Sequence, residues 1–363
     1  MRTAEFDYPL PKHLIAQVPS KQRDHARLMV LGRNHQRIEH RKFFQITEYL
    51  TPTDVLILNN TKVIPVKLIG KRISGGLVEI LMVKEISPDY WSVLVQGRGR
   101  LKNGEIINLS DENLRAELRL IGTEWFIKFS AVPTGPATGG SAAADRQADI
   151  KPYLERIGKM PLPPYIKRVK KDDPYEVLDR ERYQTVYANK AGSIAAPTAG
   201  LHFTPDLLDN IRTKGTKIAY LTLMIGRGTF KPVQTPEVSE HRMETEYFEV
   251  PLETVRVLID ACRNRRRIIA VGTTVCRVLE TIADDVIKVH EPKSYTGWSR
   301  LFICPPYQFK LVGGLITNFH LPKGTPLILT SAFAGREKVM EAYQEAIKEG
   351  YRFYSYGDAM AIL

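Results

Sequence analysis

Two histidines and one aspartate follow short apolar or aromatic runs, and they are the side chains best suited to move protons. His202 lies in the loop 195–203 before a helix start, His320 follows the apolar run 311–316, and Asp358 ends the segment 353–358. A neutral imidazole can accept a proton, and a carboxyl group can donate one. If these runs are strands that end at one edge of a sheet, the three groups can converge. We therefore predict His202, His320 and Asp358 as an acid/base set; the alternative is a connector in which His202 is structural.

Two turns that contain glycine are candidates for binding an anionic or polar group. One follows the run 217–225, and the other leads from the run 267–271 into a helix. A strand, a turn of small residues and a helix start together present backbone N–H groups to a ligand. Neither turn matches a dinucleotide fingerprint or a P-loop, so the ligand could be a phosphate or a carboxylate, and tight turns that simply need glycine are the alternative. The binding residues predicted here and in the neighbouring loops are Gly226, Gly228, Thr229, Gly272, Thr273, Thr274, Gly200 and Asn318.

The elements that must position these groups follow two patterns. Short β-rich runs separated by turns fill residues 55–130, which predicts a compact antiparallel barrel or sandwich. Residues 131–149 are rich in Pro, Gly, Ala and Ser, so they predict a flexible linker or loop with too little apolar surface to offset its ordering entropy. From residue 150 onward strands alternate with helices, predicted from 205, at 275–282 and at 337–349. This alternation predicts an α/β domain with a largely parallel sheet or an open barrel.

The composition limits the partners and the kinds of site. The chain has 363 residues, enough for about two domains, and its net charge of +12 favours a polyanionic partner such as nucleic acid. The basic runs 167–171 and 263–267 could contact an RNA backbone, and solvated surface is the alternative. Three widely spaced cysteines predict neither a disulfide framework nor a metal site. No apolar stretch approaches membrane-spanning length, so we expect a cytoplasmic protein that binds no metal and no membrane.

Several longer motifs occur in order over nearly the whole chain. They include Asn60-Thr-Lys-Val-Ile-Pro65, Arg182-Tyr-Gln-Thr-Val-Tyr187, Ala195-Ala-Pro-Thr-Ala-Gly-Leu-His-Phe203, Val271-Gly-Thr-Thr274, Thr317-Asn-Phe-His-Leu-Pro322 and Tyr351-Arg-Phe-Tyr-Ser-Tyr-Gly-Asp-Ala-Met360. Together they resemble the S-adenosylmethionine:tRNA ribosyltransferase-isomerases of queuosine biosynthesis. The resemblance is specific because it rests on many motifs instead of one.

This resemblance implies a reaction on tRNA. The ribosyl part of S-adenosylmethionine would move to the 7-aminomethyl-7-deazaguanine at the wobble position and rearrange, giving epoxyqueuosine with release of adenine and methionine. S-adenosylmethionine is then the ribosyl donor, the precursor-bearing tRNA is the partner, and the protein is expected to be a monomer. The family fold is an open, barrel-like α/β core that is discontinuous in sequence. Here the core would comprise residues 1–54 and 150–363, with an antiparallel β-barrel domain inserted at 55–130.

The resemblance also implies roles for further residues. Tyr183, Gln184 and Thr198 would line the base or the ribose, and the two glycine-containing turns would hold polar groups of the donor. Arg277, one helical turn beyond Thr274, would face the methionyl carboxylate or a tRNA phosphate.

The chain departs from the family pattern inside these motifs. Met224 replaces a histidine, Arg227 a small residue and Gly313 an aspartate, while Val275-Cys276 stands where Ser-Val is usual. Methionine cannot exchange a proton, and Arg227 adds bulk and charge beside a predicted turn. Two alternatives therefore stay open: a diverged enzyme that acts on another nucleoside or RNA, and a non-catalytic RNA-binding protein.

Overall fold

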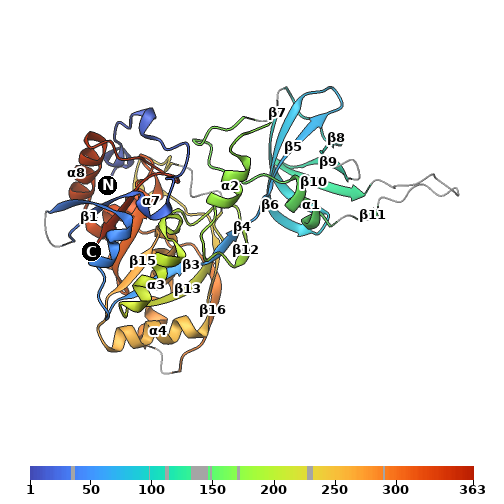
Figure 1. The fold of residues 1–363 in the computed structure, drawn as a ribbon. Coiled ribbons are helices and arrows are strands. Elements are labelled where there is room, and N and C mark those ends of the chain that lie inside the picture. The colour runs from blue at the N-terminus through green and yellow to red at the C-terminus, as the bar shows by residue number, and fades with distance from the viewer. Residues whose placement is uncertain are drawn as a thin grey trace. The chain divides into compact units, whose positions relative to one another are not determined.

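The described chain divides into two units, each assembled from segments that are far apart in the sequence (Figure 1). The larger unit comprises Met1–Val63, Pro163–Lys167 and Arg182–Leu363, and the smaller unit comprises Ile64–Leu162 and Arg168–Glu181. The structure is a computed structural model that describes residues 1–33, 37–97, 99–110, 114–131, 146–147, 149–169, 172–226, 232–288 and 291–363.

Among the described residues, nine strands form a mixed sheet at the centre of the larger unit. Four neighbouring strands, β13, β3, β15 and β17, run parallel to one another. In order across the sheet the strands are β16 (Tyr295–Ser299), β14 (Glu246–Val250), β13 (Lys217–Leu223), β3 (Val55–Asn59), β15 (Ile268–Val271), β17 (Val312–Asn318), β18 (Ala359–Ile362), β1 (Arg27–Leu31) and β2 (Ile38–Lys42). A separate pair, β4 (Thr61–Val63) and β12 (Lys190–Ser193), is also parallel.

Both faces of the large sheet are buried, which explains why its central strands are apolar throughout. Along β3, Val55 and Ile57 pack into one hydrophobic core, while Leu56 and Leu58 pack into the other, as side-chain alternation in a strand requires. The first core is completed by α4 (Leu252–Arg263), α5 (Thr273–Thr281), α6 (Ala283–Lys288), α7 (Thr325–Ala334) and α8 (Arg336–Lys348). The second is completed by α3 (Pro205–Thr213) and the 3₁₀ segments η4 (Phe43–Glu48) and η5 (Thr198–His202). The predicted α/β core is confirmed.

The helix start predicted at Thr204 is also confirmed. The Thr204 hydroxyl accepts a hydrogen bond from the Leu207 backbone N–H at 3.1 Å, and Pro205 lies in the first turn of α3. Gly215 follows the helix with a φ of +93°, which glycine adopts without strain. The helices predicted at 275–282 and 337–349 are α5 and α8.

The smaller unit contains a closed antiparallel barrel. Six described strands form a ring, because β10 pairs with both β7 and β9. Alternate residues of β6, such as Val78, Ile80 and Met82, are buried. The ring consists of β10 (Glu124–Ala131), β7 (Tyr90–Gly97), β6 (Leu77–Ser87), β5 (Lys67–Arg72), β8 (Glu105–Asn108) and β9 (Leu114–Ile121). The predicted inserted β-barrel is therefore confirmed, and a sandwich is excluded.

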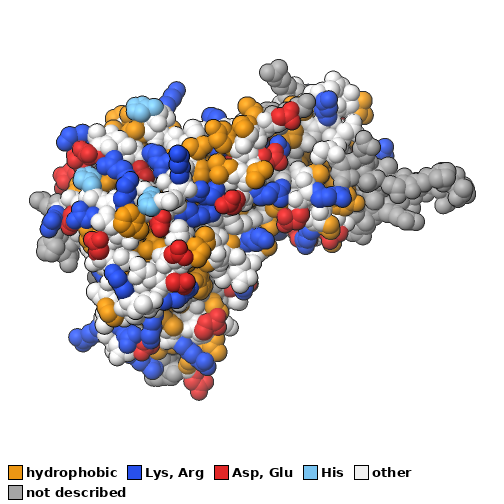
Figure 2. Space-filling view, viewed as in Figure 1, with side chains coloured by type: hydrophobic (Ala, Val, Ile, Leu, Met, Phe, Trp, Pro, Cys, Tyr) orange, Lys and Arg blue, Asp and Glu red, His pale blue; other side chains and the backbone are white. Residues whose placement is uncertain are grey.

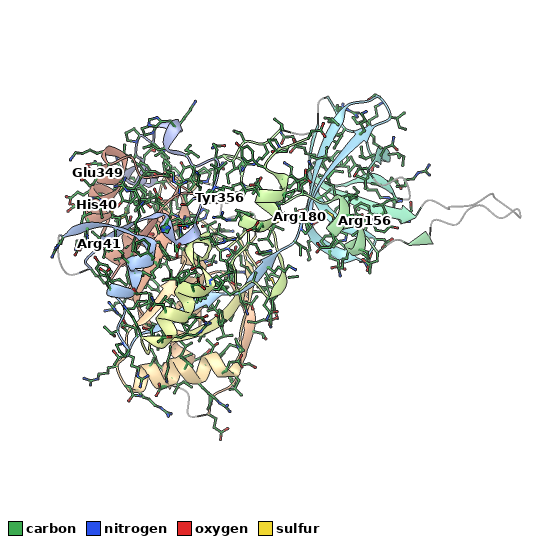
Figure 3. The ribbon with its side chains drawn as sticks, viewed as in Figure 1. His40, Arg41, Arg156, Arg180, Glu349 and Tyr356 are labelled. Carbon is green, nitrogen blue, oxygen red and sulfur yellow. The ribbon has the colours of Figure 1, made fainter. Side chains whose placement is uncertain are left out.

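Two short helices accompany the barrel, α1 (Lys151–Ile157) and α2 (Glu176–Arg182). Arg180 on α2 donates hydrogen bonds to the carbonyl oxygens of Glu155, at 3.0 Å, and Gly158, at 2.7 Å. Figure 3 marks Arg180 on α2 and Arg156 on α1. These bonds satisfy carbonyl groups in and just after the last turn of α1, which the helix itself leaves without partners.

The limits of the two units differ from the predicted ones. The strand β3, expected in the inserted domain, lies in the middle of the large sheet, where it pairs with β13 and β15. Residues 150–162 and 168–181, expected in the α/β core, belong to the smaller unit. An unbroken apolar run is typical of a strand buried on both faces, and this signal should have separated β3 from the barrel. Of the predicted linker 131–149, residues 132–145 and 148 lie outside the described residues, and Arg146–Gln147 form β11.

Candidate active site

One edge of the large sheet gathers most of the predicted site residues. The parallel strands β13, β3, β15 and β17 all end at this edge, and β18, which is antiparallel to β17, begins there. Asn318, the last residue of β17, pairs with Ala359, so Asp358 is near Asn318 and His320. Ligands of open α/β sheets bind beyond the carboxyl ends of the parallel strands.

A hollow of about 660 Å³, which includes the open space at its mouth, lies at this edge. We call it the large hollow. Its walls come from the start of α5, the end of β17, the segment that leads into η5, and the aromatic segment before β18. Six predicted site residues line it: Thr198, Gly272, Thr273, Thr274, Asn318 and His320.

His320 is the predicted catalytic residue that lines the large hollow. Its Nε2 atom lies 2.7 Å from the Thr317 hydroxyl, and its backbone N–H donates to the Tyr343 hydroxyl at 2.9 Å. The Tyr8 hydroxyl donates to the carbonyl oxygen of His320. Burial lowers the pKa of His320 to about 3, so the ring is neutral at neutral pH and can accept a proton.

His202 does not line the large hollow but contacts Asn318, which does. The Asn318 Nδ2 atom donates to the Tyr354 carbonyl oxygen at 3.0 Å and lies 3.3 Å from Nε2 of His202. A carbonyl oxygen can only accept, so this contact orients the amide and makes Nε2 of His202 the accepting nitrogen. Burial lowers the pKa of His202 to about 4, against a smaller opposing effect of the Asp358 carboxylate. His202 is thus a neutral group in contact with Asn318.

The Asp358 carboxylate is engaged in contacts of its own. The backbone N–H of Arg27 donates to Oδ1 at 2.9 Å, and that of Arg352 donates to Oδ2 at 2.8 Å. The Arg352 guanidinium lies 3.4 Å from Oδ1. Asp358 is buried and does not line the large hollow, but its charge acts on His202. The structure therefore places His320 in the large hollow and leaves His202 and Asp358 outside it, with His202 in contact with Asn318.

A second hollow of about 360 Å³, the small hollow, shares Thr273 and Thr274 with the large one. Arg277 lines the small hollow. Its Nη1 atom forms an ion pair with Glu246, and its Nε atom donates to the Leu301 carbonyl oxygen at 3.0 Å. The start of α5 therefore borders both hollows.

Other predicted binding residues lie outside both hollows and have structural contacts. The Gln184 side-chain amide accepts from the Val63 N–H and donates to the Val63 carbonyl oxygen, both at 3.0 Å. Tyr183 is fully buried, and burial raises the pKa of its hydroxyl. Gly226 donates its backbone N–H to Glu246 at 2.9 Å. A role for these residues toward a substrate stays a prediction.

Gly200 also lies outside both hollows, and its small size is required by packing. A Cβ atom here would lie 2.0 Å from the Tyr187 hydroxyl and 2.9 Å from Cγ2 of Thr185. We expect Gly200→Ala to lower the free energy of unfolding by about 1–3 kcal/mol, because a close-packed interior must shift to admit the methyl group. Urea unfolding measures this loss. Gly226→Ala is the control, since the nearest described atom to its Cβ would be Oε1 of Glu246, at 3.9 Å; equal unfolding midpoints for the two variants would contradict the prediction.

The departures from the family pattern lie away from the large hollow wherever the structure describes them. The Met224 sulfur lies 3.4 Å from the Thr61 hydroxyl, and Cys276 is buried within α5. A Cβ atom at Gly313 would lie 3.1 Å from Cγ of Arg267, so this position faces the residue that precedes β15. The predicted turn residues Gly228 and Thr229, together with Arg227, lie outside the described residues.

Sequence reasoning missed some walls of the large hollow. The hydroxyl groups of Tyr165 and Ser355 lie 2.6 Å apart, and both residues line the hollow together with Tyr354. Tyr354 has a φ of +72°, which a bulky residue rarely adopts. The aromatic segment before Asp358 could have indicated Tyr354 and Ser355 as site residues. Nothing in the sequence around Tyr165 indicates which residues the Tyr165 side chain contacts.

Comparison with known proteins decides the family. The family model described as queuosine biosynthesis protein matches residues 3–362. The chain belongs to this family. Queuosine biosynthesis proteins similar to it include the S-adenosylmethionine:tRNA ribosyltransferase-isomerases of Sulfurihydrogenibium sp., 45% identical over 364 residues, and of Thermotoga maritima, 46% identical over 363 residues. Both alignments cover 100% of this chain and 100% of the relative.

A solved structure of this queuosine biosynthesis family is similar as well. It is the crystal structure of the S-adenosylmethionine tRNA ribosyltransferase from Thermotoga maritima, with a TM-score of 0.53 and 37% sequence identity. The superposition covers 99% of this chain and 100% of that one. Within the described residues, no cluster of three or more His, Cys, Asp or Glu side chains could hold a metal ion. The helices of the described segments are all too short or too polar to cross a membrane.

Proposed function

We propose that the protein transfers the ribosyl part of S-adenosylmethionine to the 7-aminomethyl-7-deazaguanine of a tRNA and rearranges it to epoxyqueuosine, with release of adenine and methionine. The observation that carries the proposal is the full-length similarity to relatives named S-adenosylmethionine:tRNA ribosyltransferase-isomerase. The large hollow supports it, because a neutral imidazole and a helix start lie together at the strand ends.

The reaction requires a base, and we assign this role to His320. The positive sulfur of the donor acidifies the neighbouring ribose carbon, so a neutral imidazole can remove its proton. The Thr317 hydroxyl, 2.7 Å from Nε2, restrains the ring. Adenine departs more easily when it is protonated. The imidazolium formed on His320 would be an acid of low pKa, so we propose that it returns the proton to the departing adenine.

We assign Asn318 to substrate binding, with His202 and Asp358 as positioning residues. The Oδ1 atom of Asn318 has no hydrogen-bond partner within the described segments, and Asn318 lines the large hollow. Its Nδ2 atom is occupied by Tyr354 and His202. Oδ1 is therefore available to accept a hydrogen bond from the substrate. This assignment replaces the direct acid/base roles that the sequence suggested for His202 and Asp358.

Exposed side chains of the two basic runs would contact the tRNA backbone. In the view of Figure 2, Lys and Arg side chains are scattered among acidic and hydrophobic ones. Within the two basic runs, Arg168 pairs with Asp179 and Arg267 pairs with Asp54, each at 2.6 Å. These two arginines have partners in the fold. Contacts of the basic runs with RNA phosphates would come from exposed residues such as Arg263 and Arg265.

Incubation of the purified protein with S-adenosylmethionine and precursor-bearing tRNA tests the proposal. We expect adenine and methionine to be released in equal amounts, and mass spectrometry of the digested tRNA to show epoxyqueuosine. Omission of S-adenosylmethionine is the control. A different modified nucleoside would indicate a diverged enzyme, and unchanged tRNA that still binds the protein would indicate a non-catalytic RNA-binding protein. We further propose that the protein works as a monomer, as the family resemblance implies, and in the cytoplasm, where the tRNA substrate is found.

A further inference from the structure

The small hollow is lined by two residues with buried polar atoms for which the described residues supply no hydrogen-bond partner. The Nη2 atom of Arg277 and the Oγ1 atom of Thr274 are buried, and neither has a hydrogen-bond partner in the described part of the chain. Both residues line this hollow, and they are 7% and 8% exposed. A buried polar group without a partner is costly, above all when it is charged. Such atoms at a cavity wall indicate a ligand that would satisfy them.

Two helix starts border the same hollow. Thr273 and Thr274 in the first turn of α5 line it, and so do Thr325 and Pro326 in the first turn of α7. No side chain of the described residues caps either helix. The first N–H groups of a helix have no partner within the helix, and they carry a partial positive charge. Both helix starts therefore favour a negatively charged group in the small hollow.

The surroundings favour an amino-acid carboxylate over a phosphate. Glu246 forms an ion pair with Arg277, so the pair as a whole carries no net charge. A phosphate with two charges would lose its hydration without a matching excess of positive charge, whereas a zwitterionic amino acid brings no net charge. Met243, Phe302 and Leu329 supply apolar walls, which suit a chain of methylene groups beside a sulfur atom.

We propose that the small hollow binds the methionyl end of S-adenosylmethionine, with its carboxylate on Arg277 Nη2, Thr274 Oγ1 and the first turn of α5. This inference rests on the proposed function. Because the two hollows share Thr273 and Thr274, the ribosyl part would then lie in the large hollow, which His320 lines. The inference also decides between the two ligands suggested for Arg277. A guanidinium that is 7% exposed meets a small ligand inside a cavity, not a phosphate on the surface of a folded tRNA.

Titration calorimetry with two unreactive ligands tests the inference. S-adenosylhomocysteine has the amino acid of the donor but a neutral thioether, and 5′-deoxy-5′-(3-aminopropylthio)adenosine is its decarboxylated counterpart. Each is titrated into the full-length protein, alone and with saturating precursor-bearing tRNA. We expect the wild-type protein to bind S-adenosylhomocysteine at least about 10-fold more tightly than the decarboxylated ligand, since hydrogen bonds to a charged group are the strong ones.

Variants at the small hollow should change the discrimination between the ligands. We expect Thr274→Val, which keeps the side-chain shape, to weaken S-adenosylhomocysteine binding about 5-fold and to leave the decarboxylated ligand unaffected. Arg277→Lys should remove more of the discrimination, because lysine cannot contact Glu246 and the ligand with separate nitrogens. Thr213→Val at the exposed end of α3 is the matched control and should behave as wild type, since Thr213 lines neither hollow.

Four outcomes of these binding experiments would overturn the inference. Equal affinity of the wild-type protein for both ligands, equal weakening of both by Thr274→Val, or no binding of either ligand under either condition would exclude a carboxylate site. Weaker tRNA binding with unchanged discrimination would indicate a phosphate site instead. The titrations do not depend on turnover. If the protein discriminates between the two ligands but forms no epoxyqueuosine, the proposed function is wrong and the amino-acid site stands. If it forms epoxyqueuosine without discriminating between them, the proposed function stands and the amino-acid site is wrong.

Discussion

His320→Gln should release adenine about 1,000-fold more slowly than the wild-type protein, because glutamine cannot take up a proton and general-base catalysis contributes about 10²–10⁴-fold. Glutamine can still reach the Thr317 hydroxyl, which lies 2.7 Å from the imidazole in the wild type. The fold should therefore survive, and the loss should appear in kcat. Adenine is measured by chromatography at saturating S-adenosylmethionine and tRNA, and circular dichroism checks that the variant is folded.

A matched histidine controls for this substitution. His13 is exposed and lines neither hollow, so His13→Gln should keep the wild-type rate. If His320→Gln retains more than about a tenth of the rate, or raises KM while kcat is unchanged, His320 binds substrate and is not the base.

The free energy of unfolding should fall by several kcal/mol as the pH is lowered from about 6.5 to 4, since each unit of pKa difference corresponds to about 1.4 kcal/mol. Burial lowers the pKa of His202 to about 4 and that of His320 to about 3, from the ordinary value of 6.5. Below pH 6.5 the unfolded chain takes up protons on both imidazoles, whereas the folded chain does not. The unfolded state is therefore favoured as the pH falls, and the full contribution is present above pH 6.5.

Urea unfolding at a series of pH values between 4 and 8 measures this effect. His202→Gln should reduce the slope of stability against pH within this window, because one titrating group has been removed. Thr213→Val should leave the slope unchanged, since it removes no titratable group. A wild-type stability that is constant from pH 6.5 to 4 would show that both imidazoles titrate normally in the folded protein.

Features that depend on neighbours in the chain were predictable from the sequence. The start of α3 at Thr204-Pro205 is an example, because capping involves residues only three apart. The β-rich character of the barrel and the concentration of site residues at strand ends also followed from local patterns. The strand β3 was assigned to the wrong unit because its apolar run was grouped with the β-rich runs that follow it. Its unbroken apolar pattern indicates burial on both faces, and its pairing with β13 and β15 shows that it lies in the large sheet.

The candidate site likewise combines features that the sequence predicts with features that depend on tertiary contacts. Residue type and position after an apolar or aromatic run selected His202, His320 and Asp358, and spacing along a helix selected Arg277. Which of these line a cavity depends on contacts between residues distant in sequence. The Asn318 amide meets a histidine 116 residues away, and Arg277 pairs with a carboxylate 31 residues away.

The sequence by itself determined the family, the two kinds of domain, the local helix starts and the inventory of groups that could do chemistry, because these follow from motifs and short-range periodicity. Only the tertiary structure decided that His320 lines the large hollow, whereas His202 contacts Asn318 and Asp358 lies outside the hollow. Only it showed that Thr274 Oγ1, at the start of α5, and Arg277 Nη2 are buried without a hydrogen-bond partner among the described residues. The physical reason is that cavity lining and hydrogen-bond satisfaction depend on how side chains from separate strands and helices meet, and no local pattern encodes that arrangement.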